Sequence, residues 1–505
     1  MSLSGYKKLT TAEPFIAVAL ALLILIVSNR SGVGWSWDST DYVAAGRSLS
    51  RGLGSLDVVG YPMFVRPPGY PALISIGEFI NIKTNTTLLT INLLSAGFVV
   101  FFTYKLLRHT TSHTTTVLGT LFIVLSPSLL WQFTMAWSEP PFLAVEMACL
   151  FVALVLKTHW KYPILLLLYV GLFFVRFVGP VFAIPIALIT VFVDRPAIGW
   201  IRALIYNVLA LGVSFVPTWW WLQRNKDVSG TFTGPRSGGG GTLIQAFTNG
   251  LATIGTFFSA QPFDSVVYDK WSLYPIAAQL GLLFVVLTLV ITSIILIKRL
   301  ISHDCPMPRS TALVLLMMFS VVSAYLFFSA YRFVHLEYGR LDTRMMVPIL
   351  VPLVIALAIM VDSSVSEIRF RQIGVIAASV LLIIPQSIVT GHDALSFGRT
   401  SRHMAAVSSK NQPIHVFARS LPDLTGLFSN APQQLSGAVD AWPIFHQFQR
   451  DFVRPIPCTH RFVVWYKDFP WQEHIPDIAP VLYDDALGTI YDLGLCTVDI
   501  HTVWP

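Results

Sequence analysis

Long apolar segments recur along almost the whole chain, and this repetition limits its possible folds more than any single motif does. A helix that crosses a bilayer needs about 20 predominantly apolar residues. Of the 505 residues, 54% are hydrophobic and only 12% are charged, whereas soluble domains carry about 25% charged residues. So few charges cannot cover a water-soluble globule of this size. The sequence therefore predicts an integral membrane protein.

The apolar segments predict about eleven transmembrane helices, although several are shorter than the usual span. Backbone groups inside a bilayer must find their hydrogen bonds within the segment, which favours helices. The expected fold class is therefore an all-α polytopic membrane protein. The predicted spans are residues 14–29, 88–107, 116–131, 139–157, 162–175, 177–193, 201–222, 273–297, 311–329, 345–361 and 372–390.

The short loops on one side of this topology are all basic. Lysine and arginine collect in cytoplasmic loops because they resist translocation, so this side is predicted to be cytoplasmic. The N-terminus then lies in the cytoplasm and the C-terminus outside it, in a multi-pass protein of the plasma (inner) membrane. The same rule accounts for the formal net charge of +7 without nucleic acid as a partner. The basic loop residues are Lys105, Arg108, Lys157, Lys161, Arg195, Arg202, Lys298, Arg299, Arg309, Arg369 and Arg371.

Three long segments share the predicted outer face. Residues 1–390 are expected to form a transmembrane domain with a first outer loop at about 30–87 and a flexible loop at about 223–272, and residues 391–505 a small mixed α/β extracytoplasmic domain. Long loops in compact proteins are usually functional or disordered. Four glycines at 238–241 fit either a mobile lid over a substrate or a plain linker. Cys458 and Cys496 both fall in the tail, where a disulfide is compatible with the predicted location.

The first outer loop carries two carboxylates three residues apart, Asp38 and Asp41, followed by Tyr42. On a short helix this spacing places both carboxylates on one face. A carboxylate near the apolar boundary can have a raised pKa and serve as a general base. The alternative is structural, because Asp38 or Ser39 can cap the start of a helix.

Arg66 precedes Pro67 and Pro68, which hold the chain extended. A guanidinium group matches the oxygens of a phosphate, so a stiffened arginine at the membrane surface suits a phosphate ligand. Snorkelling of the side chain to lipid headgroups explains the same residue without a substrate.

Four further charged residues reach the same predicted face. Glu139 stands at the mouth of a span, where it is either catalytic or a carboxylate favoured by the helix dipole. Arg176 interrupts an apolar stretch and needs an anionic partner or an aqueous cavity. Arg340 and Arg344 precede another span. Together they fit a lipid phosphate site or, alternatively, separate charges at the rim.

In this order the motifs resemble those of the GT-C superfamily of polyprenyl-phosphate-sugar-dependent glycosyltransferases, in particular its protein O-mannosyltransferase and lipid A aminoarabinose transferase branch. Those families carry an Asp with a Tyr four residues later, then a basic residue with a Pro-Pro element, then a Ser-Glu-Pro turn, and arginines in later outer turns. The matching residues are Asp38, Tyr42, Arg66 to Pro71, Ser138 to Pro140, Arg176, and Arg344 to Pro348. The resemblance covers roughly residues 1–390.

This resemblance implies a GT-C-like bundle that transfers a sugar, hexosyl or pentosyl, from a polyprenyl-phosphate donor with inversion. The acceptor would be a hydroxyl of a glycan, lipid or protein. Asp38 would take the acceptor proton, and Arg66, Arg176 and Arg344 would stabilise the phosphate leaving group. Asp41, Tyr42, Glu139 and Arg340 are expected to bind substrate. Ser39 stands where the family often has a second acid, so no cofactor is certain and a divalent metal remains an open possibility.

Two other classes of protein compete with this interpretation. A transporter or flippase for a lipid-linked sugar would share the arginines and the many spans, but such proteins often show internal repeats and broken helices, and no clear repeat is present. A membrane scaffold with a partner-binding tail would not need polar residues concentrated at Asp38, Arg66 and Glu139.

Overall fold

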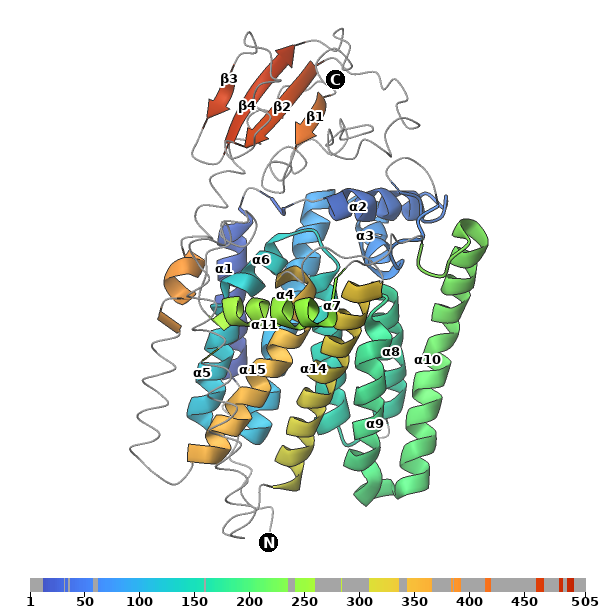
Figure 1. Ribbon diagram of the computed structural model, residues 1–505, viewed down its shortest axis with the longest axis vertical. Coiled ribbons are helices and arrows are strands. Elements are labelled where there is room, and N and C mark those ends of the chain that lie inside the picture. Colours follow the sequence, from blue (N-terminus) through green and yellow to red (C-terminus); the bar gives the residue numbers. More distant parts are fainter. Residues whose placement is uncertain are drawn as a thin grey trace.

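The computed structural model of the chain describes residues 12–30, 32–34, 37–57, 62–158, 160–234, 241–258, 283, 308–335, 343–365, 383–384 and 386–391 and four strands of the tail. The described part is a helical bundle (Figure 1). Its helices are α1 (Glu13–Ser28), α2 (Trp37–Ser50), α3 (Gly69–Phe79), α4 (Thr84–Thr110), α5 (His113–Val124), α6 (Pro127–Thr134), α7 (Glu139–Val155), α8 (Lys161–Val175), α9 (Gly179–Ile198), α10 (Trp200–Ser229), α11 (Leu243–Phe258), α14 (Arg309–His335) and α15 (Thr343–Val365).

Among the described residues, five helices are long and apolar enough to cross a membrane, namely α4, α9, α10, α14 and α15, or six if the bent pair of α5 and α6 forms one span. Helices α1 and α8 are apolar but shorter. The protein is thus a multi-pass helical membrane protein. The figure of about eleven spans stays a prediction, because the segment 273–297 and most of 372–390 lie outside the described residues.

Helix α10 has the side-chain distribution of a lipid-facing helix. Its buried positions include Ala203, Ala210 and Ser214, which are small enough to let α8 and α9 approach closely. Its exposed positions include Val216 at 64% and Trp220 at 65%. A helix in water buries its large apolar residues and exposes its polar ones. The reversed pattern on α10 indicates hydrocarbon as its surrounding solvent.

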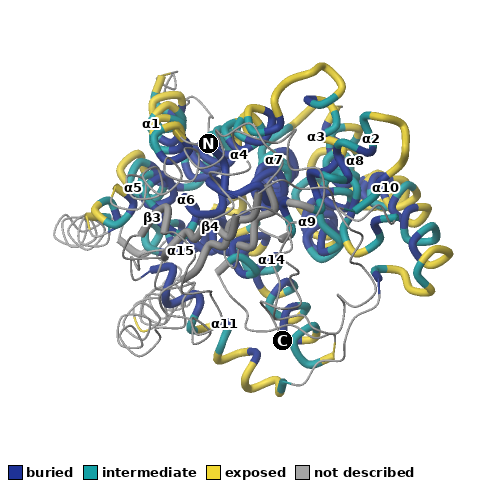
Figure 2. Tube along the Cα trace, turned by 90° about the horizontal axis from the view of Figure 1, so that it is seen from above, coloured by how far each residue is buried: buried dark blue, intermediate teal, exposed yellow. Residues whose placement is uncertain are grey.

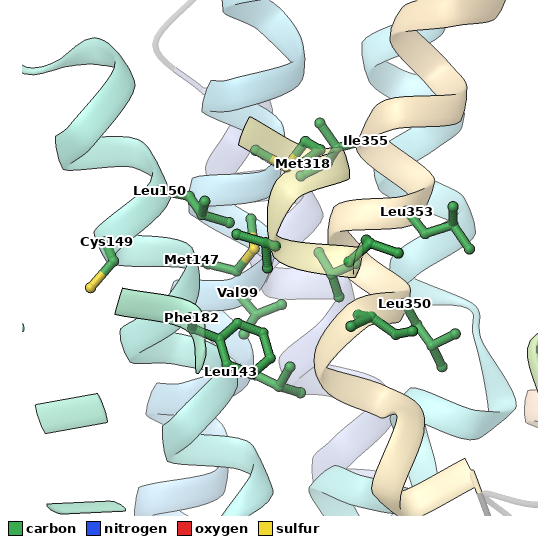
Figure 3. Close-up of a cluster of buried hydrophobic side chains, with 14 of the residues drawn as sticks. Val99, Leu143, Met147, Cys149, Leu150, Phe182, Met318, Leu350, Leu353 and Ile355 are labelled. Atoms are coloured by element: carbon green, nitrogen blue, oxygen red, sulfur yellow. The ribbon is translucent and has the colours of Figure 1, made fainter. Parts of the chain in front are cut away.

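The centre of the bundle is a continuous apolar core. Side chains from α4, α7, α9, α14 and α15 meet there, as Figure 3 shows for Val99, Met147, Phe182, Met318 and Leu350. Seen along the bundle, buried residues concentrate in α4 and α7 and exposed residues mark the outer helices (Figure 2). This close-packed interior fixes the relative positions of the helix ends.

The first outer loop is folded and contains α2 and α3. Helix α2 lies across one end of the bundle, and α3 packs beside it (Figure 1). The loop between them brings Pro67 and Pro68 to the start of α3, where Pro68 is the N-cap residue. This segment is therefore a platform at the end of the apolar bundle.

The structure corrects two boundaries expected from the sequence. The predicted single span 116–131 is two helices, α5 and α6, that meet at an angle of 50°. The cause is local: Ser126 accepts a hydrogen bond from the backbone N–H of Leu129, and Pro127 occupies the first turn of α6, so a new helix begins there.

The second correction concerns the loop predicted at 223–272. Helix α10 continues to Ser229 and ends at Gly230, whose φ of 75° suits a helix terminus. Residues 243–258 then form α11, which crosses the bundle (Figure 1). Much of this loop is therefore helical, and the glycines at 238–240 lie outside the described residues.

In the tail, four strands form one sheet in the order β1-β2-β4-β3. The strands are β1 (Ile414–Ala418), β2 (His460–Tyr466), β3 (Val481–Asp484) and β4 (Gly488–Gly494). Strands β1 and β2 pair in parallel, and the other two pairings are antiparallel. The predicted mixed α/β domain is thus described only in its strands. Cys458 and Cys496, with their predicted disulfide, lie outside the described residues.

The contact between α3 and α8 depends on a glycine. A Cβ atom on Gly69 would lie 2.5 Å from the backbone oxygen of Phe174, which no side-chain rotation can relieve. We expect Gly69→Ala to destabilise the protein by about 1–3 kcal/mol and to lower the apparent melting temperature in detergent. Gly212→Ala in α10 is the control, because nothing lies within 4 Å of its Cβ position. Equal melting temperatures for the two variants would contradict this account.

Candidate functional site

Charged side chains from distant parts of the sequence meet at the end of the bundle where α2 lies. All are half-buried or buried, and each contacts an opposite charge in the group. We call this group the arginine–carboxylate cluster, and it consists of Asp38, Asp41, Arg66, Glu139, Arg176 and Arg344.

Asp38 and Asp41 lie on one face of α2, as their spacing predicted. Nη2 of Arg66 is 2.5 Å from Oδ1 of Asp38 and 3.3 Å from Oδ2 of Asp41. Asp38 lies within the first turn of α2, which begins at Trp37, so it is not the capping residue. The loop before Pro67, which bends at Val65 and Arg66, thus brings a guanidinium group to both carboxylates.

Arg344 joins the two halves of the cluster. Its Nη2 is 2.6 Å from Oδ2 of Asp38, and its Nε donates to Oε1 of Glu139 at 2.7 Å. The guanidinium group lies 4.2 Å from the ring centre of Trp137, a distance suited to a cation–π contact. The start of α15 is therefore tied to α2 and α7 together.

Glu139 is the most deeply buried carboxylate of the cluster. Its side chain is fully buried, and Oε1 contacts both Arg176 and Arg344. Oε2 has no hydrogen-bond partner among the described residues. Glu139 is also the first residue of α7, so the helix-start role and the ion-pair role both apply to it.

Tyr42 packs inside the cluster. Its hydroxyl lies 3.0 Å from the hydroxyl of Ser138, and its ring lies 5.2 Å from the guanidinium carbon of Arg66. The ring also meets that of Tyr70 edge to face at 5.0 Å. Tyr42 thereby connects α2 to the Ser-Glu-Pro turn and holds one side of Arg66.

The end of α10 holds the loop that carries Arg66. Arg224 donates to the backbone oxygen of Met63, and Nδ2 of the buried Asn225 donates to that of Phe64 at 3.1 Å. The sequence analysis missed both residues. Their only sequence signal is a polar pair just beyond a predicted span, and lipid headgroups explain such a pair equally well.

The pKa values of the two aspartates are shifted in opposite directions, although Arg66 lowers both. Burial raises the pKa of Asp38, but the guanidinium groups of Arg344 and Arg66 lower it by more, so it lies well below its usual value. Burial also raises the pKa of Asp41, Arg66 lowers it, and the negative charges of Asp38 and Asp57 raise it again. The resulting pKa of Asp41 is about 6. The two carboxylates therefore differ in basicity although they share an arginine.

Of the predicted site residues, seven lie together: Asp38, Asp41, Tyr42, Arg66, Glu139, Arg176 and Arg344. Arg340 lies outside the described residues. Two further buried or half-buried carboxylates lie outside the cluster. Glu78 is paired with Arg47 and Thr84. Glu146 is fully buried in α7, and neither of its side-chain oxygens has a partner among the described residues.

The cluster does not fit a divalent metal well. Within the described residues, no group of three or more His, Cys, Asp or Glu side chains could hold a metal ion. The carboxylates of Asp38, Asp41 and Glu139 are instead paired with guanidinium groups, whose positive charges would repel a cation. We therefore derive no chemical step through a metal.

Fold and site together define a multi-pass helical membrane protein with buried arginines and carboxylates at one end of its bundle. No protein-family model matches the sequence, and a search of curated proteins finds no match. The structure is similar to the crystal structure of ArnT from Cupriavidus metallidurans bound to undecaprenyl phosphate, with a TM-score of 0.52 and 13% sequence identity over 96% of this chain and 98% of that one. The predicted resemblance to GT-C glycosyltransferases is confirmed at the level of the fold.

Two further solved structures are more distant. The archaeal oligosaccharyltransferase AglB from Archaeoglobus fulgidus has a TM-score of 0.42 and 10% identity over 78% of this chain and 58% of that one. The arabinofuranosyltransferase AftD from Mycobacteria has a TM-score of 0.45 and 13% identity over 95% of this chain and 41% of that one.

The buried ion pairs of Glu139 predict a large effect of its neutralisation. Glu139→Gln would leave two buried guanidinium groups without their anion, and breaking a buried pair in this way costs about 3–5 kcal/mol. Glu78→Gln is the matched control, because its pair with Arg47 is partly exposed and such pairs contribute about 0–1 kcal/mol. The apparent melting temperature in detergent should fall much further for Glu139→Gln. Equal decreases would show that Glu139 is not needed to balance the arginines.

Proposed function

We propose that the protein is an integral membrane glycosyltransferase that transfers a sugar from a polyprenyl-phosphate donor to a hydroxyl acceptor, with inversion, on the extracytoplasmic side of the plasma (inner) membrane. The observation that carries the proposal is the gathering of Arg66, Arg176 and Arg344 with three carboxylates at one end of an apolar bundle. The bundle has the fold of a protein solved with undecaprenyl phosphate.

The arginines suit the phosphate of such a donor. Each guanidinium group already contacts one or two carboxylate oxygens in the cluster, and phosphate oxygens match the same donors. When the bond between the sugar and the phosphate breaks, negative charge grows on the leaving phosphate. Fixed positive charges in a poorly hydrated site stabilise that charge strongly.

The charge distribution along α7 supports the proposed orientation. The helix begins at Glu139 in the cluster, and the exposed Lys157 lies two residues beyond its last residue, Val155. Seventeen helical residues span about 25 Å, so the cluster and this basic end are separated by most of a bilayer. Since basic loops stay in the cytoplasm, these charges support the proposed location of the cluster on the extracytoplasmic side, above a proposed transmembrane domain of residues 1–390.

The transfer itself needs one base and one attack geometry. An acceptor hydroxyl of a glycan, lipid or protein attacks the anomeric carbon from the side opposite the phosphate, which inverts its configuration. The hydroxyl loses its proton to a carboxylate as it attacks. The sequence assigned this base to Asp38, and the donor sugar is a hexose or a pentose.

Arg66 offers the most direct test of the phosphate site. We expect Arg66→Ala to weaken binding of undecaprenyl phosphate by about 10²-fold, and Arg66→Lys to weaken it less, because lysine keeps the charge but loses the forked donor geometry. Binding to purified protein in detergent measures both. If both variants bind like wild type, Arg66 does not contact the phosphate.

Asp38 offers the test of catalysis. We expect Asp38→Asn to insert and fold but to reduce transfer by at least about 10²-fold. The assay measures polyprenyl phosphate released from synthetic polyprenyl-phosphate hexoses and pentoses with an envelope-lipid extract as acceptor. Wild-type protein that binds undecaprenyl phosphate but releases none from any donor would support a transporter or flippase for a lipid-linked sugar instead.

A further inference from the structure

Asp38 has both carboxylate oxygens occupied by arginine. Oδ1 is 2.5 Å from Nη2 of Arg66, and Oδ2 is 2.6 Å from Nη2 of Arg344. Such short, charge-assisted contacts are the strong members of their class. To take a proton, Asp38 would have to give up part of this pairing in a buried site. Its geometry suits the holding of two arginines better than the acceptance of a proton.

Asp41 has a different environment one turn further along α2. Among the described residues, both of its hydrogen bonds come from Arg66 and reach Oδ2, at 3.3 and 3.4 Å. Its side chain is 18% exposed. Oδ2 of Asp41 is thus weakly held, and within the described part of the chain Oδ1 accepts no hydrogen bond, which leaves it available to a hydroxyl that approaches Arg66.

The surroundings of Asp41 also suit a base that works near neutral pH. Arg66 from the outer loop, Asp38 from α2 and Asp57 are the charged groups that act on it, and together with burial they bring the pKa of Asp41 to about 6. A base is most effective when its pKa lies near the working pH. The pKa of Asp38, by contrast, is held far below that range.

We propose that Asp41 takes the proton from the acceptor hydroxyl, and that Asp38 is a positioning residue that holds Arg66 and Arg344 at the donor phosphate. This inference rests on the proposed function. In the step, the acceptor oxygen forms a bond to the anomeric carbon while the bond from that carbon to the phosphate oxygen breaks. The proton moves to Asp41, and the electron pair of the broken bond leaves on polyprenyl phosphate between the arginines.

The pH dependence of transfer separates the two aspartates. Asp41 must be ionised to act, so the wild-type rate should be constant above pH 7 and fall about tenfold per pH unit below about 6. Asp41→Asn should transfer sugar at least about 10²-fold more slowly, and its rate should not decrease further below pH 6. Asp41→Glu keeps a carboxylate and should keep the fall at acid pH.

Asp38→Asn should transfer sugar more slowly than wild type at every pH. Its transfer rate should still decrease at acid pH, but the decrease should begin at a lower pH than in wild type. The shift follows because the negative charge of Asp38 raises the pKa of Asp41, and the variant lacks that charge. Asp57→Asn is the control outside the cluster. It should keep the wild-type rate at neutral pH and shift the fall in the same direction, because Asp57 also raises the pKa of Asp41.

The outcomes distinguish this inference from the proposed function. The inference is overturned, and the proposed function stands, if Asp41→Asn keeps the wild-type rate and pH profile, or if Asp38→Asn is the variant whose profile becomes flat. If wild-type protein transfers no sugar from any polyprenyl-phosphate hexose or pentose at any pH, both are overturned. Asp41→Asn, Asp41→Glu and Asp57→Asn should retain the wild-type melting temperature to within the effect measured for Glu78→Gln, so that loss of folding is not mistaken for loss of the base. Asp38→Asn loses contacts to two arginines and should melt at a lower temperature, so its rate is measured well below that temperature and it is judged by the shape of its pH profile.

Discussion

The cost of burying a guanidinium group is the constraint on which the rest of this structure depends. Arg66, Arg176 and Arg344 are largely or fully removed from water at the end of an apolar bundle, and a cation in such a place needs an anion close by. The carboxylates that balance these arginines come from two turns of α2 and from the start of α7. The platform of α2, the mouth of α7 and the start of α15 are therefore fixed relative to one another by charge balance as much as by apolar packing.

This constraint also explains how an anionic substrate can enter a site that is already full of ion pairs. A phosphate that reaches the arginines does not meet bare cations, because carboxylates hold them in place. It exchanges one set of oxygen partners for another and so avoids the cost of bare buried cations before binding. The carboxylate with the longest contacts, Asp41, is the one whose pairing is easiest to give up. In the proposed reaction, donor binding and proton uptake are in this way linked through Arg66.

The sequence predicted the class of the fold and most of the cluster because both depend on local patterns. Apolar length marks spans, Asp38 and Arg66 are polar residues of the loop between two such spans, and Glu139 stands at the mouth of one. The sequence could not predict which charged residues form ion pairs, because partners such as Arg344 and Asp38 are separated by most of the chain. It also missed the break at Ser126–Pro127, because α5 and α6 together have the length of a single apolar span. Asn225 was missed for a related reason. Its side chain binds the backbone oxygen of Phe64, and because every residue has a backbone oxygen, no residue type in the sequence indicates such a contact.

The proposed division of roles between Asp38 and Asp41 rests on more than residue type and spacing. Both are aspartates on one face of α2, and both contact Arg66. What separates them is the number of guanidinium groups within reach, two for Asp38 and one for Asp41. The second guanidinium belongs to α15, which is joined to α2 only by the packing of the whole bundle. Asp38, held between two arginines, fixes their positions well and accepts a proton poorly. Asp41 contacts one arginine and lies near two other acids, so it is the better proton acceptor of the two in the proposed reaction.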